Sequence, residues 1–272
     1  MKIGIVGLGL IGGSLAKAIR ATTRHEIIGY DIREEIVMQA LKEGVIDATG
    51  IKGVTGADIT FICLYPQEAV EFINTHEFSG IVCDTCGVKK YVYDHIDRTR
   101  VRYVGTHPMA GREISGYSAS DAALFDNASL ILVREEDTDK DALRRVHRLA
   151  RELPFETIVI TTAKEHDRVI AYTSQLAHVV SSAYIKSDTA EKYDGYSAGS
   201  FQDMTRVACL APKMWTELFL MNKEPLIDEI TKIVLHLEEF RLALQTQDEQ
   251  TLYDLLKAGS DRKKMLNRNR RD

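Results

Sequence analysis

The first residues along the chain that suggest chemistry are glycines spaced for binding a phosphate. They belong to the segment Gly7, Leu8, Gly9, Leu10, Ile11 and Gly12, which has the pattern Gly-x-Gly-x-x-Gly. The segment follows a strand candidate, residues 2–6, and precedes a helix candidate, residues 11–22. In such a unit the first glycine permits the tight turn, the second lets a pyrophosphate approach the backbone, and the third lets helix and strand pack closely. Because backbone N–H groups at a helix N-terminus attract anions, residues 7–12 are predicted to bind a dinucleotide.

An acidic residue follows this segment at the distance expected of a ribose ligand. Asp31 ends the second strand candidate, about 20 residues after Gly12. A carboxylate at this place accepts hydrogen bonds from the ribose 2′-OH and repels a 2′-phosphate. The sequence therefore predicts NAD rather than NADP as the cofactor. Two features leave this open, since Arg33 is nearby and Asp31 is also a candidate cap for the next helix.

A histidine lies where an open α/β sheet binds its ligands. His107 stands in the segment Gly105–Gly111, after a strand candidate at residues 101–104, and is expected on a loop at the carboxyl end of that strand. An imidazole with an ordinary pKa of about 6.5 accepts protons near neutral pH. Removing hydride from a carbinol needs such a base, because the hydroxyl proton leaves as C=O forms. The residues alone support a general base and a structural loop histidine equally.

The cysteines offer a second, weaker candidate. Cys83 and Cys86 have the spacing of redox and zinc sites, but Cys63 and Cys209 stand alone, so the further pair of ligands that zinc requires is missing. Cys83 also lies inside an apolar strand candidate, whereas a reactive thiol needs exposure. Core packing is the preferred interpretation, and no metal is predicted.

Strands and helices alternate in the first part of the chain, and helices alone follow. The predicted strands are 2–6, 26–30, 59–64, 80–84, 102–105, 129–133 and 156–160. The helices predicted among them are 11–22, 34–43, 67–75, 89–96 and 139–152, and the later ones are 163–186, 199–210, 212–221, 223–246 and 248–264. This order is typical of an α/β Rossmann-type, doubly wound parallel sheet, residues 1–160, followed by an all-α domain, residues 161–272. Apolar residues at helical spacing from Ile227 to Leu244 predict a buried core or a contact between subunits.

Composition limits the possible partners. The chain has 272 residues and a net charge of −5, which argues against a nucleic-acid partner. The sequence contains no run approaching about 18 apolar residues, so no membrane span is expected. The N-terminus lacks the features of a signal peptide, and the few cysteines do not suggest a secreted protein. A cytoplasmic location is expected.

Several motifs, taken together, resemble those of prephenate and arogenate dehydrogenases. The segment Thr106–Gly111 is similar to the family's H-P-[MI]-A-G signature, and Asp84 with Val88 and Lys89 is similar to its D-x-x-S-V-K segment. Further matches in order are Ser174–His178, Gly199–Arg206 and Pro212–Trp215, so the resemblance covers nearly the whole chain.

This resemblance implies a reaction and a set of residue roles. It implies an oxidative decarboxylation in which His107 takes the hydroxyl proton and NAD takes the hydride. Arg206 is implied to bind a substrate carboxylate, a group that suits the guanidinium fork. His178, Gln175 and Ser174 are implied to line the substrate pocket. The helical domain is implied to form a homodimer.

Two positions depart from the family's pattern. Gly87 stands where the family has a serine that hydrogen-bonds the catalytic histidine, and Gln175 replaces a histidine. Thr85 and Cys86 are the neighbouring candidates to replace the serine.

Other functions stay open. The sequence does not choose between prephenate and arogenate as substrate. A β-hydroxyacid-type dehydrogenase of the same build is a second enzyme class, although it would be expected to use a catalytic lysine. A nicotinamide-binding sensor without turnover is the alternative outside enzymes.

Overall fold

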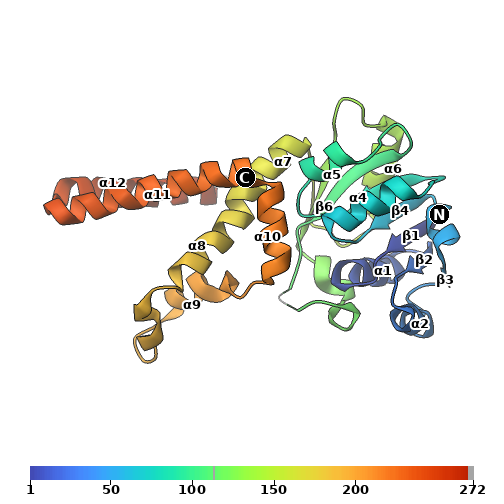
Figure 1. The fold of residues 1–272 in the computed structure, drawn as a ribbon, viewed down its shortest axis with the longest axis horizontal. Helices are drawn as coiled ribbons and strands as arrows, with labels where there is room; N and C mark the ends of the chain where they lie inside the picture. The colour runs from blue at the N-terminus through green and yellow to red at the C-terminus, as the bar shows by residue number, and fades with distance from the viewer. Residues whose placement is uncertain (113, 269–272) are drawn as a thin grey trace. The chain divides into compact units, whose positions relative to one another are not determined.

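The computed structural model describes residues 1–112 and 114–268 (Figure 1). The chain divides into two compact units, one from Met1 to Lys223 and one from Glu224 to the C-terminus. The last strand ends at Thr161, so the first unit contains the whole sheet and also four of the later helices. Residue 160, near which the sequence analysis places a domain boundary, lies within the first of these units and close to the end of the sheet.

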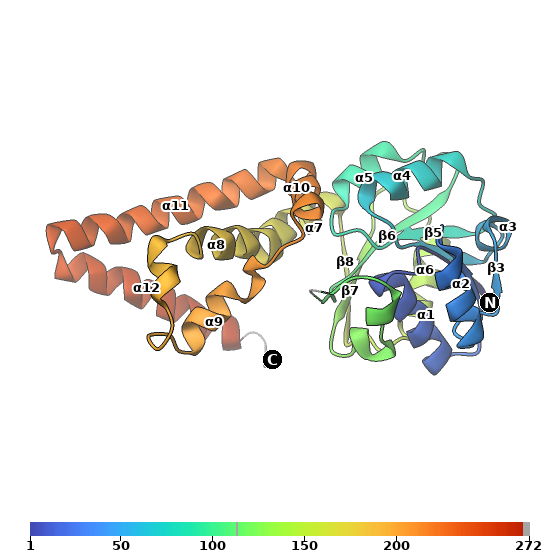
Figure 2. The same cartoon turned by 60° about the horizontal axis from the view of Figure 1, so that its bottom comes forward.

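Within the described residues, eight strands form one sheet in the order β3-β2-β1-β4-β5-β6-β7-β8 (Figure 2). Their bounds are β1 Lys2–Val6, β2 Glu26–Tyr30, β3 Ala48–Thr49, β4 Ile59–Ile62, β5 Ile81–Asp84, β6 Arg102–Pro108, β7 Ser129–Val133 and β8 Thr157–Thr161. The strand order reverses at β1, since β2 lies on one side of it and β4 on the other. Such a switch point is where open α/β sheets bind ligands, beyond the carboxyl ends of the strands.

Helices cover both faces of the sheet. One face carries α1 (Leu10–Thr22), α2 (Glu34–Lys42) and α6 (Lys140–Ala150), and the other carries α3 (Ile51–Thr55), α4 (Pro66–Thr75) and α5 (Lys90–His95). Successive strand residues alternate between the two cores: in β5, Cys83 belongs to the first and Val82 to the second. The doubly wound Rossmann-type sheet predicted from the sequence is confirmed.

The last two strands run in a direction that the sequence did not reveal. β7 is antiparallel to β6, and β8 is parallel to β7. Two 3-10 turns in the connection between β6 and β7, Tyr117–Ala119 and Ala122–Phe125, pack against α1. Because β7 is antiparallel to β6, it begins at the edge of the sheet where β6 ends.

The prediction that His107 lies on a loop is wrong. β6 continues to Pro108, and its last three residues pair with β7 after its pairing with β5 has ended at Gly105. His107 stands opposite Ile131 in this ladder. The histidine is therefore held by strand hydrogen bonds beyond the parallel part of the sheet.

The helical part of the first unit begins with one long helical segment. It comprises α7 (Ala163–Ile170), a π-helical turn (Ala171–Gln175) and α8 (Leu176–Tyr184), where the sequence predicts an uninterrupted helix. In the π turn, the N–H of Leu176 donates to the carbonyl of Ala171, five residues earlier. Two short helices follow, α9 (Gly199–Thr205) and α10 (Pro212–Met221).

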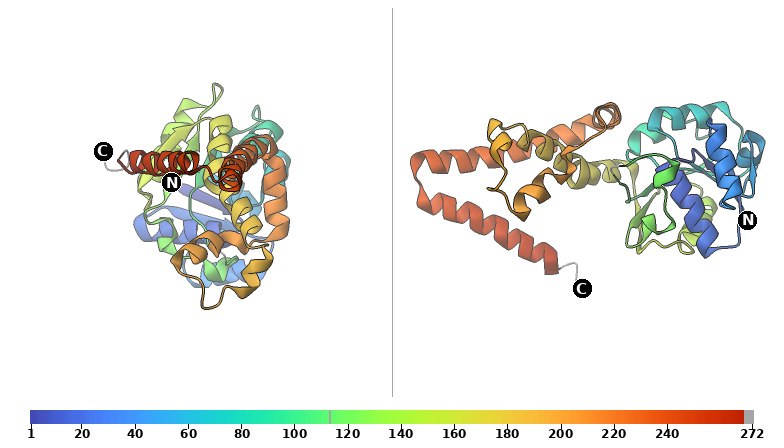
Figure 3. Two further views of the ribbon diagram at one scale, coloured as in Figure 1. Left: turned by 90° about the vertical axis from the view of Figure 1, so that its left-hand side faces the viewer. Right: turned by 90° about the horizontal axis from the view of Figure 1, so that it is seen from below.

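From Glu224 on, the second unit is formed by two long helices, α11 (Lys223–Thr246) and α12 (Glu249–Arg268), visible in orange and red in Figure 3. Leu237 and Leu244 on α11 are 61% and 62% exposed, although the sequence predicts their stripe to be covered. In the described part of the chain, no helix combines the length and the hydropathy needed to cross a bilayer.

Candidate active site

The turn after β1 has the geometry that a dinucleotide site requires. Gly7 has a φ of +85°, and its N–H donates to the carbonyl of Tyr30. A Cβ on Gly12 would lie 1.9 Å from the carbonyl oxygen of Gly7, so only glycine lets α1 start this close to β1. A Cβ on Gly9 would meet no described atom within 4 Å. The backbone at Gly9 is thus open at the N-terminus of α1, where helical N–H groups lack partners.

Asp31 supports this turn from β2. Its side chain is only 6% exposed, and its carboxylate accepts hydrogen bonds from the N–H of Leu8 at 2.9 Å and from the N–H of Arg33 at 3.0 Å. The Arg33 side chain also pairs with it. Burial acts to raise the pKa of Asp31, but the hydrogen bonds from Arg33 and Leu8 outweigh it and lower the pKa. The residue at the cap position of α2 is Arg33 rather than Asp31.

His107 contacts a second histidine that the sequence analysis missed. Its Nδ1 lies 2.9 Å from Nε2 of His166 on α7, and Nδ1 of His166 lies 2.6 Å from a carboxylate oxygen of Asp167. Burial lowers the pKa of His107 well below its usual value, and the positive charge of Lys89 acts in the same direction. His107 is therefore neutral near pH 7, as a proton acceptor must be.

A buried ion pair between Lys89 and Asp84 contacts Thr106, the residue before His107. Lys89 is 1% exposed, and its ammonium bonds both to the carboxylate of Asp84 and to the carbonyl oxygen of Thr106. Tyr103 and the N–H of Thr106 donate to the other oxygen of Asp84, at 2.7 and 3.3 Å. The network thereby joins the end of β5 to the residue that precedes His107.

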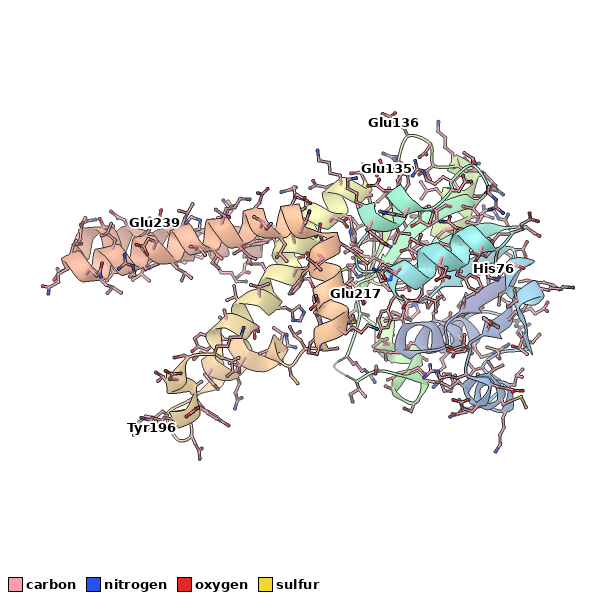
Figure 4. All side chains as sticks on the ribbon, viewed as in Figure 1. His76, Glu135, Glu136, Tyr196, Glu217 and Glu239 are labelled. Carbon is pink, nitrogen blue, oxygen red and sulfur yellow. The ribbon has the colours of Figure 1, made fainter. Side chains whose placement is uncertain are left out.

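The start of α7 is fixed by polar contacts with its surroundings. Glu135, labelled in Figure 4, accepts a hydrogen bond from the N–H of Ala163. Thr162 caps the helix, because its side-chain oxygen accepts a hydrogen bond from the N–H of Glu165. Asp167 accepts hydrogen bonds from the N–H groups of Lys89 and Lys90, at 2.8 and 2.9 Å. Since Asp167 also contacts His166, the first turns of α7 are tied to the loop after β5.

The space beside His107 is left open by Gly87. A Cβ at this position would lie 3.9 Å from Cε1 and Nε2 of His107, on the side of the ring away from its contact with His166. The neighbours suggested as substitutes for the family serine bond elsewhere: among described residues, Thr85 donates to Ile62 and Cys86 to Leu64. The ring partner of His107 is thus His166.

A second group of predicted residues lies on α8, α10 and the turn between α9 and α10. The Nδ1–H of His178 donates to the carbonyl of Val207 at 3.0 Å, and its ring lies 3.9 Å from that of Trp215. Arg206 precedes Val207 and is exposed. Glu217, labelled in Figure 4, adds a partly buried carboxylate on α10.

Gln175 does not lie on an open surface. It is 2% exposed, and its amide oxygen accepts a hydrogen bond from Asn222 at 2.8 Å. Asn222 also donates to the carbonyl of Asp167, so this amide pair supports the π turn. The environment of Gln175 favours a structural role over the predicted contact with a ligand, whereas Ser174 is partly exposed.

Cys83 and Cys86 are buried, whereas Cys63 is partly buried and Cys209 is exposed. Burial raises the pKa of the Cys83 and Cys86 thiols well above their usual value, so both are neutral. All four cysteines are free thiols. This environment favours core packing over redox chemistry.

Comparisons with known proteins point to one family. A model described as the nucleotide-binding domain of prephenate dehydrogenase matches residues 15–159, and one described as its dimerization domain matches residues 162–258. The chain is 31% identical to prephenate dehydrogenase of Bacillus subtilis over 94% of this chain and 74% of that protein. It is similar to the crystal structure of A. aeolicus prephenate dehydrogenase in complex with hydroxyphenyl propionate and NAD+, with 29% identity, a TM-score of 0.86 and 98% of both chains covered. It also resembles Synechocystis arogenate dehydrogenase, with 26% identity, a TM-score of 0.81, and 97% of this chain and 100% of that one covered.

Two glycine substitutions separate the packing and binding roles of the turn. Gly12→Ala forces a methyl group against the Gly7 carbonyl, so it should lower the melting temperature and abolish NADH binding. Gly9→Ala meets open space, so the melting temperature should hold while NADH affinity falls. Thermal melts and fluorescence titrations with NADH measure both. Unchanged affinity in Gly9→Ala would show that the pyrophosphate does not approach this backbone.

Substitution of Lys89 tests the buried ion pair. Lys89→Met leaves the carboxylate of Asp84 buried without its partner, which should cost about 3–5 kcal/mol in the free energy of unfolding. The matched control is Lys90→Met, which removes an exposed pair with Asp94 and should cost less than about 1 kcal/mol. Urea denaturation of the two variants provides the comparison. Equal losses would mean that the Asp84 carboxylate finds another partner.

Proposed function

Since this chain belongs to the prephenate dehydrogenase family and is a dehydrogenase, as its motifs predicted, we propose that it converts prephenate to 4-hydroxyphenylpyruvate with NAD as the oxidant. The observation that carries the proposal is the position of His107. It stands at the carboxyl edge of the sheet that also bears the glycine turn, with Nδ1 engaged by His166 and Nε2 beside the open space at Gly87. Arogenate is the alternative substrate, because the chain also resembles Synechocystis arogenate dehydrogenase.

The residues around the turn fit NAD. Gly9 leaves room for a pyrophosphate, and the start of α1 offers N–H groups to it. Asp31 presents a carboxylate of lowered pKa for the ribose hydroxyls, and Arg33 is paired with that carboxylate. This pairing favours NAD over NADP, because a 2′-phosphate would compete with Asp31 for the guanidinium. NAD, when bound, supplies the acceptor for the hydride.

The chain's own residues handle the proton and orient the substrate. His107 takes the hydroxyl proton through Nε2 as the C=O bond forms. Arg206 binds a carboxylate of the substrate, and His178 and Ser174 line the same pocket. The hydrogen bond of His178 to Val207 leaves its Nε2 as a hydrogen-bond acceptor when the ring is neutral. Loss of the ring carboxylate as CO2 makes the ring aromatic, which drives the reaction.

The enzyme is proposed to act as a homodimer in the cytoplasm. The family model that matches residues 162–258 describes a dimerization domain. The exposed leucines of α11 supply apolar surface that a second subunit would cover. The boundary between the nucleotide-binding and dimerization domains is proposed to lie near residue 160.

Turnover assays test the proposed reaction. Prephenate and arogenate, each with NAD and with NADP, are followed by the absorbance of the reduced nicotinamide. Prephenate with NAD should be the active combination, and His107→Asn should reduce kcat about 10²–10⁴-fold, as expected on losing a general base. Near-normal turnover in that variant would exclude His107 as the base. Absence of turnover with all four combinations would favour a nicotinamide-binding sensor.

Charged substitutions on α11 test the dimer. Replacing Leu237 and Leu244 together with Glu should convert a dimer to monomers, because burying two carboxylates in an apolar interface is strongly unfavourable. Light scattering after size-exclusion chromatography gives the mass. Gln245→Glu is the control, since it adds charge at an exposed polar position of the same helix and should leave the mass unchanged. A monomeric mass for the unsubstituted protein would refute the dimer.

A further inference from the structure

We propose that His166 and Asp167 are positioning residues that hold His107 in the tautomer with its proton on Nδ1, so that Nε2 is the proton acceptor. The proposal deepens the function proposed above and rests on it for the role of His107. It concerns a hydrogen-bonded row of three side chains: His107 Nδ1 to His166 Nε2 at 2.9 Å, and His166 Nδ1 to Asp167 Oδ1 at 2.6 Å.

The direction of these hydrogen bonds follows from Asp167. Oδ1 of its carboxylate accepts from the N–H of Lys89, and Oδ2 accepts from the N–H of Lys90. Backbone N–H groups only donate, so both oxygens act as acceptors, and the hydrogen between Asp167 and His166 belongs to Nδ1 of His166.

The neutral state of His166 then determines the state of His107. Burial lowers the pKa of His166 although the carboxylate of Asp167 opposes this, so the ring is neutral near pH 7. A neutral imidazole with its proton on Nδ1 has only a lone pair on Nε2. Nδ1 of His107 must therefore be the donor, which leaves Nε2 of His107 without a proton. The opposite tautomer would place two lone pairs 2.9 Å apart and lose the hydrogen bond.

The position of His166 is fixed as well as its protonation. Its side chain is fully buried, and both of its nitrogens are engaged. The capping of α7 by Thr162 and Glu135 holds the first turn of the helix, three residues before His166. His166 is therefore held in one orientation, and it in turn orients His107. A buried aspartate orients the histidine base of a catalytic triad in a similar way.

Gly87 has no side chain that could hydrogen-bond to His107, so another residue must orient this ring. The open space over Gly87 adjoins Nε2 and Cε1 of His107. His166 occupies the opposite ring nitrogen, so orientation of the ring and access to its basic nitrogen come from different sides. No side chain at position 87 is needed to orient the ring.

Nitrogen NMR of the full-length protein tests the tautomer without reference to turnover. In protein labelled with ¹⁵N-histidine, the ring signals of His107, assigned from their loss in His107→Asn, should show Nδ1 protonated and Nε2 unprotonated near pH 7. Finding the proton on Nε2 of His107 would overturn the proposal, and this measurement needs no variant of His166.

Two substitutions of His166 separate positioning from packing. His166→Phe keeps the buried ring but removes the acceptor, so His107 should become a mixture of tautomers. The value of kcat should fall about 10- to 100-fold with KM nearly unchanged, a part of what a general base contributes. His166→Gln restores an acceptor toward His107 and a donor toward Asp167, so it should recover the tautomer and much of kcat. If His107 had the same tautomer and kcat the same value in the unsubstituted protein and in His166→Phe, the positioning role of His166 would be refuted. If His107 were protonated on Nδ1 but the protein turned over no substrate, the positioning role of His166 and Asp167 would be supported and the proposed function refuted.

Discussion

The arrangement of the site depends on the buried ion pair between Asp84 and Lys89. Each charge has left water, and each is stable there only while the other is present. The side chain of Lys89 reaches Thr106 on β6, and its backbone N–H reaches Asp167 on α7. The end of β5, the second half of β6 and the start of α7 thus share one polar core. His107 lies where these three elements meet, so the strand that carries it and the helix that orients it cannot shift independently.

The features that the sequence predicted well are local ones. The glycine turn depends on six consecutive residues, and the strands around it depend on short apolar runs. The bounds of α10 and α11 follow from Pro212 at the first turn of one helix and from a long periodic pattern in the other, and both match the prediction. Asp31 was found because its distance from the glycines is a property of the βαβ unit.

The features that the sequence did not reveal depend on contacts between distant segments. β6 extends through His107 because β7 supplies hydrogen-bond partners from residues 130–132. His166 lies 59 residues from His107, and its sequence neighbours give no sign of that contact. Thr162 and Glu165 mark the start of a helix, but an adjacent His-Asp pair on a helix is equally typical of an exposed face. Gln175 was assigned to the substrate pocket by its place in a motif, whereas its burial and its hydrogen bond with Asn222 show it to be interior.

The π turn between α7 and α8 sets the rotational phase of the residues that follow it. Each residue advances an α-helix by about 100°, so the extra residue of the π turn shifts every later side chain around the axis by about that amount. His166 precedes the turn and His178 follows it, so the two histidines belong to helical segments of different phase. A mutation that deleted one residue here could restore a regular helix at little local cost. It would nevertheless rotate His178 away from Val207 and Trp215 while leaving His166 in place.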